Sequence, residues 1–194
     1  MPPKAKISKE MILEEAFQIA RAQGADKITA RSISQGLNCS TQPILYYFGT
    51  VEEIKAAVYQ RADEYHSRRL MNTDHDYGNP MLNIGMNYIR FAAEERNLFR
   101  FLFQSNEFSN VSLTDLVQSE NLTPVLQVLR QETGVAADEA REIFMTLFVF
   151  VHGYASLFAN NEMTYDEKLI TEALKKIFSG AVCAAKEVPN EKTV

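Results

Sequence analysis

A short stretch near the N-terminus carries polar and aromatic side chains at a spacing that could read a DNA duplex. The stretch is STQPILYYF, residues 40–48. At 100° per residue, a helix there places Ile44 and Phe48 on one side and Gln42 and Tyr46 on the other. Glutamine can bond bidentately to adenine, and apolar atoms of tyrosine can meet thymine methyl groups. We therefore predict a DNA-facing surface centred on Gln42 and Tyr46.

The residues around this pair support the same chemistry. Ser40 and Thr41 can contact phosphates at the start of the helix, and Pro43 and Leu45 can meet thymine methyl groups. The helix contains no Arg or Lys, so any base readout depends on neutral groups. An ordinary packing contact with the following helix could also explain an outward Leu45.

The elements that must position these side chains are two short helices joined by a tight turn, the pattern of a helix-turn-helix. Thr29 is predicted to cap the first of them, and Ser40 the second. Capping boxes start further helices at Thr50–Glu53 and Thr164–Glu167. We predict an all-α chain with helices over 9–23, 30–36, 41–47, 51–70, 80–95, 97–105, 124–133, 138–160 and 165–186.

Composition agrees with a folded helical protein. Of the 194 residues, 46% are apolar and 23% charged, and the few Gly and Pro leave room for long elements. The net charge of −5 is uneven, because residues 1–60 hold seven Lys/Arg and six Asp/Glu while the rest hold 13 and 19. This distribution predicts that any DNA contact lies in the first third of the chain.

The sequence gives little support to a secreted protein, a membrane protein or an enzyme. The two cysteines lie far apart in sequence, which indicates a reducing, cytosolic protein, and no signal peptide is expected. The apolar stretch 143–159 is short and interrupted by polar residues, so we expect a buried helix rather than a membrane span. No nucleophile–base pair, phosphate loop or metal-ligand spacing is found, so we expect no enzyme, no metal and no cofactor.

A longer pattern resembles a known family. The stretch ITARSISQGLNCSTQPILYYFGTVEEIKAAV is similar to the signature of the TetR (tetracycline-repressor-like) family, and the resemblance covers about residues 8–60. A weaker likeness continues in FVFVHGYASLFANN. The resemblance implies a three-helix DNA-binding head and a larger helical-bundle body for dimerisation and ligand binding. We accordingly expect a head at 1–50, a body at 51–188 and a flexible tail at 189–194.

Carried onto this chain, the family's DNA contacts imply a set of DNA-binding residues: Thr29, Arg31, Ser40, Thr41, Gln42, Pro43, Tyr46, Tyr47 and Lys55. Two positions depart from the family pattern. Leu45 stands where a Tyr is common, and Val51 stands where a Lys is common. Lys55, one turn later, can replace the lost cation. Both departures should weaken sequence-independent binding and flatten its salt dependence.

The body has two expected roles. An apolar ligand pocket could be lined by the aromatic residues Phe91, Phe103, Phe144 and Phe148, although most of the body's aromatic residues are better explained as core. His152 is best explained as a hydrogen-bonded core or interface residue. By the resemblance, the last two helices would pair across a twofold axis through Val151, Ala155, Phe158, Leu174, Ile177 and Phe178. Burial of these residues within one subunit is the alternative.

The predicted function is a cytoplasmic, ligand-responsive repressor that binds a palindromic operator as a homodimer, without membrane attachment. The alternative is a helical DNA-binding regulator that a protein partner controls in place of a small ligand. The sequence does not identify the effector or the operator.

Overall fold

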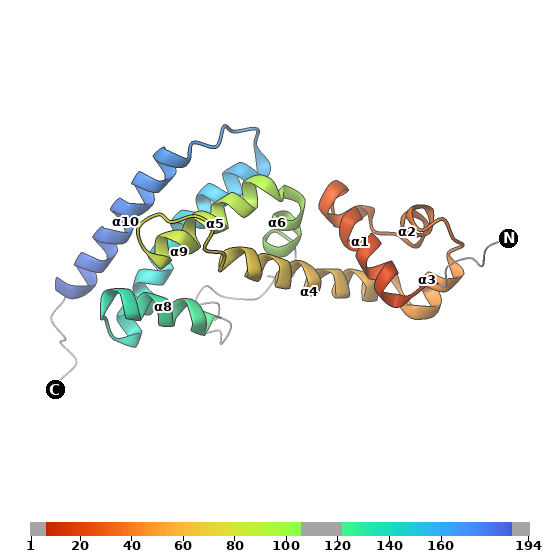
Figure 1. The fold of residues 1–194 in the computed structure, drawn as a ribbon, viewed down its shortest axis with the longest axis horizontal. Coiled ribbons are helices and arrows are strands. Elements are labelled where there is room, and N and C mark those ends of the chain that lie inside the picture. Colours follow the sequence, from red (N-terminus) through yellow and green to blue (C-terminus); the bar gives the residue numbers. More distant parts are fainter. Residues whose placement is uncertain (1–6, 106–121, 188–194) are drawn as a thin grey trace. The chain divides into compact units, whose positions relative to one another are not determined.

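The computed structural model describes residues 7–105 and 122–187, and these residues are helical with no strand (Figure 1). The predicted all-α class is confirmed. The elements, labelled as in Figure 1, are α1 (Lys9–Gln23), η1 (Ala25–Lys27), α2 (Ala30–Gly36), α3 (Gln42–Tyr47), α4 (Val51–Leu70), α5 (Pro80–Glu94), α6 (Arg96–Phe103), α8 (Thr123–Thr133), α9 (Ala137–Asn160) and α10 (Glu167–Glu187).

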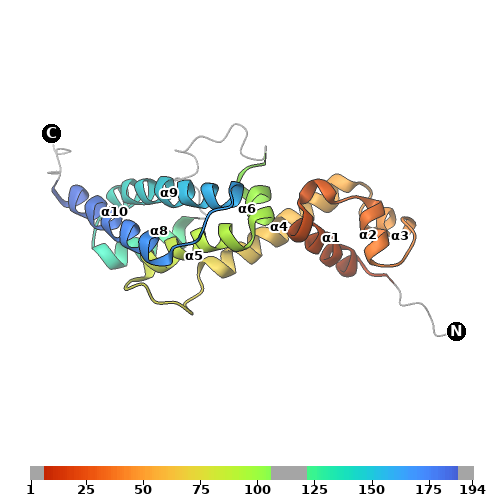
Figure 2. The ribbon, with the colours of Figure 1, turned by 90° about the horizontal axis from the view of Figure 1, so that it is seen from above.

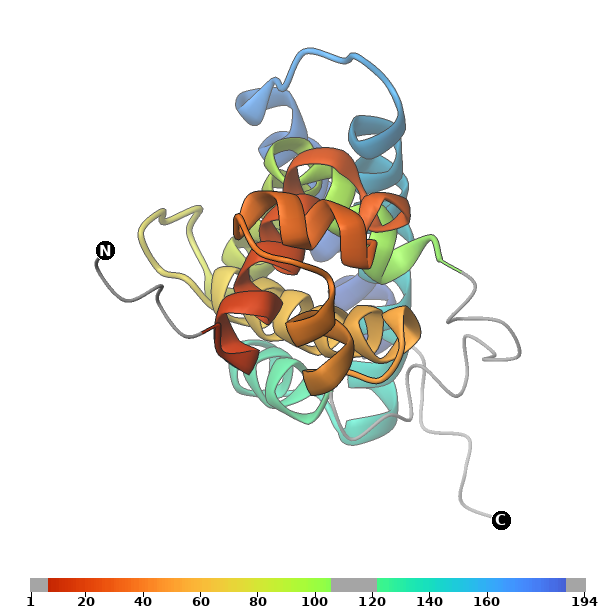
Figure 3. The same cartoon turned by 90° about the vertical axis from the view of Figure 1, so that its right-hand side faces the viewer.

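The described chain forms two compact units, and the first comprises residues 7–67 and 95–105. Helix α1 contacts α2, α3 and α6 within it. In Figure 3, α1 to α3 of this unit are drawn in red and orange. Its core consists of apolar side chains from each α-helix of the unit: Ile12, Ala16, Ala20, Ile33, Ile44, Ile54, Val58, Leu98, Phe99 and Leu102.

This unit is larger than the head predicted at residues 1–50. It includes α4 as far as Ser67 and also α6, which comes from a distant part of the sequence. The reason is that α6 buries Leu98, Phe99 and Leu102, and it packs against α1. The segment 106–121, for which the sequence predicts a loop with a short helical piece, lies outside the described residues.

The second unit comprises residues 68–94 and 122–187. Helices α5 and α9 form its centre, α10 packs against both, and α8 also contacts both (Figure 2). The side chain of Asn87, buried in α5, donates hydrogen bonds to the carbonyls of Leu70 (3.1 Å) and Asn72 (2.7 Å). It thereby satisfies the carbonyl of the last residue of α4, which has no partner within the helix, and a carbonyl of the loop that follows.

A glycine allows the three central helices of this unit to approach closely. A Cβ atom at Gly85 of α5 would lie 2.8 Å from Leu174 Cδ2 of α10 and 3.4 Å from Val151 Cγ1 of α9. Leu174 and Val151 are themselves buried. The helices therefore meet at a point where no side chain larger than hydrogen fits without movement.

Helix α9 has the length and the mean hydropathy, 1.5 over 18 residues, of a candidate membrane span. One such helix is weak support for a membrane protein, because core helices have the same composition. Eight residues of α9 are buried within this chain, where α9 contacts α5, α8 and α10. This packing is typical of a core helix.

Candidate nucleic-acid interface

Helix α2 begins at a complete capping box. The Thr29 hydroxyl accepts the Ser32 backbone N–H at 3.0 Å, and the Ser32 hydroxyl accepts the Thr29 N–H at 3.0 Å. Thr29 was predicted as a DNA-backbone contact, and its side chain is exposed but already serves as this cap. Ile33 points into the core, so α2 presents Arg31 to solvent from its opposite side.

The turn after α2 is held by its backbone. Asn38 adopts a positive φ of 49°, which Asn tolerates better than most residues. The Cys39 N–H then donates to the Ser34 carbonyl at 3.0 Å. These contacts set the direction in which α3 leaves the turn.

Helix α3 is anchored as the periodicity predicts. Ile44 is fully buried and Phe48 nearly so. The predicted cap differs, however, because Thr41 and not Ser40 occupies the N-cap position, and it makes no side-chain capping bond. The Ser40 and Thr41 hydroxyls are therefore not used as caps, and both residues are exposed.

The outward side of α3 is unusually apolar for an exposed surface. Tyr46 is 81% exposed and Leu45 46% exposed, and Gln42 lies exposed beside them. Tyr46 and Tyr47 pack edge to face with ring centroids 5.3 Å apart, and Tyr47 and Pro43 are half-buried. We call Gln42, Leu45 and Tyr46 the α3 face.

The cationic side chains of the first unit differ in the contacts they make. Arg31 is exposed and Lys55 is half-buried, and neither forms an ion pair within the described part of the chain. Lys9 lies 4.9 Å over the Phe48 ring. Arg61 is engaged by Glu10 and Glu14, and the hydrogen bond with Glu10 raises its pKa. Lys4 and Lys6 lie outside the described residues.

The four aromatic residues predicted to line a ligand pocket are divided between the two units. Phe103 belongs to the first unit, where its ring lies 5.0 Å from those of His66 and Phe99. Phe91, Phe144 and Phe148 belong to the second unit, and the Phe144 and Phe148 rings stack at 5.8 Å. Phe91 and Phe144 are buried, as the core interpretation predicts.

A polar pair continues this aromatic row. His152 Nδ1 lies 2.9 Å from the hydroxyl of buried Tyr88, and its ring centroid is 5.3 Å from that of Phe148. Burial lowers the pKa of His152 and raises that of Tyr88, so both groups are neutral near pH 7. His152 is thus hydrogen-bonded, in agreement with its predicted structural role.

The structure buries most of the residues predicted for a dimer interface. Val151, Ala155, Phe158 and Leu174 form core of a single chain, whereas Ile177 and Phe178 are half-buried. The reason is that α5, α9 and α10 pack together within one subunit, which uses the widest apolar stripes of α9 and α10.

Sequence reasoning missed the apolar residues that α9 and α10 leave exposed. On α9, Val149 is 56% exposed and Leu157 48%, with exposed Gly153 midway between them; on α10, Leu169 is exposed. The three α9 residues follow each other at intervals of four, and this second apolar stripe was visible in the sequence. We call Val149, Gly153 and Leu157 the α9 outer face.

No group of three or more His, Cys, Asp or Glu residues that could hold a metal ion occurs among residues 7–105 and 122–187. A family model described as "Tetracyclin repressor-like, C-terminal domain" matches residues 81–177, which is half of the sequence. No curated protein matches.

A solved structure, that of a TetR-like transcriptional regulator from Rhodococcus sp. RHA1, is similar to this chain with a TM-score of 0.64. The similarity covers 92% of this chain and 99% of the other, with 14% sequence identity. It extends the likeness from the C-terminal region matched by the family model to nearly the whole fold.

Proposed function

The chain belongs to the tetracycline-repressor-like (TetR) family of transcriptional regulators, and from this premise we propose that it is a repressor that binds a palindromic operator as a homodimer and leaves it when a small molecule binds. The observation that carries the proposal is the α3 face, where Gln42, Leu45 and Tyr46 are exposed while Ile44 and Phe48 are buried. The proposal places the protein in the cytoplasm and assigns it no catalytic activity.

In the proposed complex, α3 enters the major groove. The amide of Gln42 would bond to a base edge, and the Tyr46 and Leu45 side chains would meet thymine methyl groups. Ser40, Thr41, Pro43 and Tyr47 would border this contact, while Thr29, Arg31 and Lys55 would lie along the phosphates. Two heads in a symmetric dimer would then read half-sites about 34–36 Å apart or a multiple of that distance.

The test starts from a random duplex library, from which the full-length protein selects its operator. We expect Gln42→Ala and Tyr46→Ala each to weaken operator binding by about 1–3 kcal/mol. Gln60→Ala, an exposed glutamine on α4, is the matched control and should bind as the unchanged protein does. Undiminished operator binding by the Gln42 and Tyr46 variants would refute the assignment of the α3 face.

The charge of the head offers a second measurement. If Lys55 contacts a phosphate, Lys55→Gln should reduce the slope of log K for DNA binding against log salt concentration by about 0.9 per contact. It should also weaken binding to all DNA sequences alike. The same reasoning applies to Arg31→Gln. An unchanged slope in both variants would mean that the phosphate contacts are made elsewhere.

For the homodimer, the α9 outer face is the surface that supports the proposal, together with half-buried Ile177 and Phe178 of α10. No side chain contacts the position of a Cβ at Gly153, so a second helix could approach closely there. Leu157→Ser should shift the protein towards monomer in size-exclusion chromatography with light scattering. Met71→Ser, at an exposed methionine of the loop before α5, is the control. A Leu157→Ser protein that stays as dimeric as the control would refute this interface.

For the effector, the aromatic row of Phe144, Phe148 and His152, with Tyr88, supports binding of an apolar molecule that carries a hydrogen-bonding group. Phe91 and Phe103 remain proposed ligand contacts. A thermal-shift screen of small molecules identifies binders, and each binder is then tested for its effect on operator affinity. A coupling of about 1–3 kcal/mol would change operator affinity severalfold to a hundredfold. If no binder changes operator affinity, control by a protein partner becomes the better explanation.

A further inference from the structure

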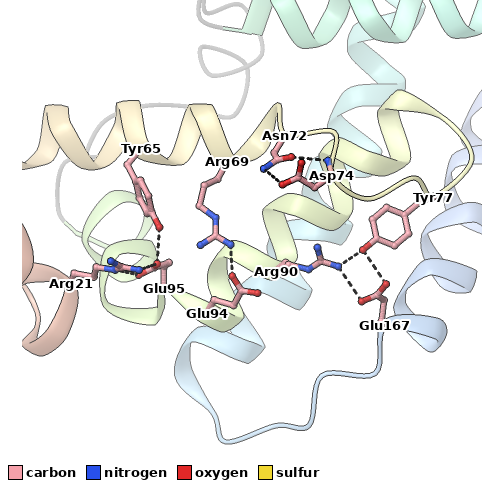
Figure 4. A network of polar contacts seen from close by, with 10 residues as sticks. All are labelled: Arg21, Tyr65, Arg69, Asn72, Asp74, Tyr77, Arg90, Glu94, Glu95 and Glu167. Atoms are coloured by element: carbon pink, nitrogen blue, oxygen red, sulfur yellow. Dashed lines mark hydrogen bonds and ion pairs between the residues drawn. The ribbon is translucent and has the colours of Figure 1, made fainter.

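A buried carboxylate joins three helices of the first unit. Glu95, at the residue before α6, is 5% exposed. It accepts hydrogen bonds from Nε of Arg21 at 2.8 Å, from Nη2 of Arg21 at 2.5 Å, and from the Tyr65 hydroxyl at 2.9 Å (Figure 4). Arg21 lies in the last turn of α1 and Tyr65 on α4. The Glu95 side chain, at the start of α6, therefore contacts residues of both α1 and α4.

Further contacts hold the end of α1 in the same place. The side-chain amide of Asn97, on α6, donates to the backbone carbonyl of Arg21 at 3.0 Å. The Arg21 guanidinium also lies 5.6 Å from the centroid of the Tyr65 ring. The start of α6 thus contacts both the side chain and the backbone of Arg21, which restricts rotation and translation of α1 together.

The first unit contains a second ionic contact between α1 and α4, and its environment is different. Arg61 of α4 pairs with Glu10 and with Glu14, whose side chains are mostly exposed. Exposed pairs contribute little to stability because water and salt screen them. By contrast, a buried carboxylate that loses its partner keeps the full penalty of desolvation. The hydrogen bond with Glu95 also raises the pKa of Arg21, so the guanidinium stays charged.

We propose that Glu95 is a positioning residue for DNA recognition: through Arg21 and Tyr65 it sets the orientation of α1 relative to α4 and α6. Helix α1 packs directly against α2 and α3, so the orientation of α1 determines where the α3 face points. The inference rests on the proposed DNA-binding function. Glu95 itself need not touch DNA, because its effect passes through the packing of α1.

Glu95→Gln tests the proposal, because it keeps the shape of the side chain and removes the charge that holds Arg21. Glu14→Gln is the matched control, since it makes the same chemical change in the exposed contact between α1 and α4. The probes are the duplex selected from the random library and a scrambled duplex of equal length. The folded fraction of each variant is measured by circular dichroism before binding.

We expect Glu95→Gln to weaken binding to the selected duplex about tenfold. This factor corresponds to the free energy of roughly one charge-assisted hydrogen bond, which the substitution removes from the contact that orients α1. Its binding to the scrambled duplex should change less than about twofold, because phosphate contacts tolerate a reoriented head. Glu14→Gln should leave both affinities within about twofold of the unchanged protein. A residue with a purely structural role would lower both affinities in parallel with the folded fraction.

Two results would overturn the inference. One is a Glu95→Gln protein that binds the selected duplex as Glu14→Gln does, and the other is an equal loss on both duplexes. If Glu95→Gln does not fold, Tyr65→Phe is the second variant, because it removes one of the three hydrogen bonds described above. It should weaken binding to the selected duplex but not to the scrambled duplex. An unchanged ratio of the two affinities in that variant overturns the inference. A wild-type protein that selects no duplex would refute the proposed function and this inference with it.

Discussion

Gly85→Ala is the substitution whose effect the packing of the second unit predicts most directly. In a helix interior, Ala is favoured over Gly by about 1 kcal/mol, so propensity alone predicts a more stable protein. The added Cβ would lie 2.8 Å from Leu174 Cδ2, and Leu174 is fixed in the core between α5 and α9. Overpacking of this kind costs about 1–3 kcal/mol. We expect the steric penalty to cancel or exceed the gain, with a net change of about 0–2 kcal/mol towards unfolding.

Gly180→Ala is the matched control. Gly180 also lies within a helix, α10, and no atom lies within 4 Å of the position of its Cβ. Its substitution should stabilise the protein by about 1 kcal/mol, so the two variants differ by roughly the steric penalty, about 1–3 kcal/mol. Urea unfolding followed by circular dichroism, at one protein concentration, measures this difference. If Gly85→Ala proved as stable as Gly180→Ala, the close approach of α5 to α10 would be refuted.

Three further predictions concern buried polar groups. Asn87→Leu leaves the carbonyls of Leu70 and Asn72 without their donor and should destabilise the protein by about 1–3 kcal/mol in urea unfolding, whereas no change would mean that water replaces the amide. Burial lowers the pKa of His66 to about 4, below its ordinary value near 6.5. The unfolded chain therefore binds this proton first, so stability should fall as the pH drops from 6.5 towards 4, by at most about 1.4 kcal/mol per pH unit. His66→Gln should flatten that part of a stability–pH profile, and an unaltered slope would contradict the burial of His66. Tyr88→Phe removes the hydrogen bond with His152 and should lower stability by about 1 kcal/mol, which thermal unfolding can measure.

The sequence predicted the described α-helices well, with differences at their ends, but it did not predict the short 3-10 helix η1. Helix α4 spans Val51–Leu70 as expected from its cap at Thr50, whose hydroxyl accepts the Glu53 N–H at 3.1 Å. The last helix was expected to start after Thr164, but α10 starts at Glu167, where the Asp166 carboxylate accepts the Leu169 N–H at 3.0 Å. Thr and Asp are both good N-cap residues, so the local sequence alone does not choose between them.

The α3 face was also predictable from the sequence, because it depends on one short helix with a period of 3.6 residues. Two buried anchors, Ile44 and Phe48, determine which side of that helix is exposed. Which apolar residues of α9 lie in the core of the chain was less predictable, for a related reason. Helix α9 has two apolar stripes, and periodicity does not tell which of them packs within the chain and which faces outward.

The sequence by itself determined the all-α class, the helix-turn-helix and the outward position of Gln42 and Tyr46, since these depend on residues close together in the chain. Only the tertiary structure decided that α6 belongs to the compact unit of α1–α4 and that Glu95 meets Arg21 across 74 residues of sequence. It also decided that Val151 and Leu174 close around Gly85. A local pattern specifies which side of a helix is apolar, whereas its partner is selected by packing among segments that are distant in sequence.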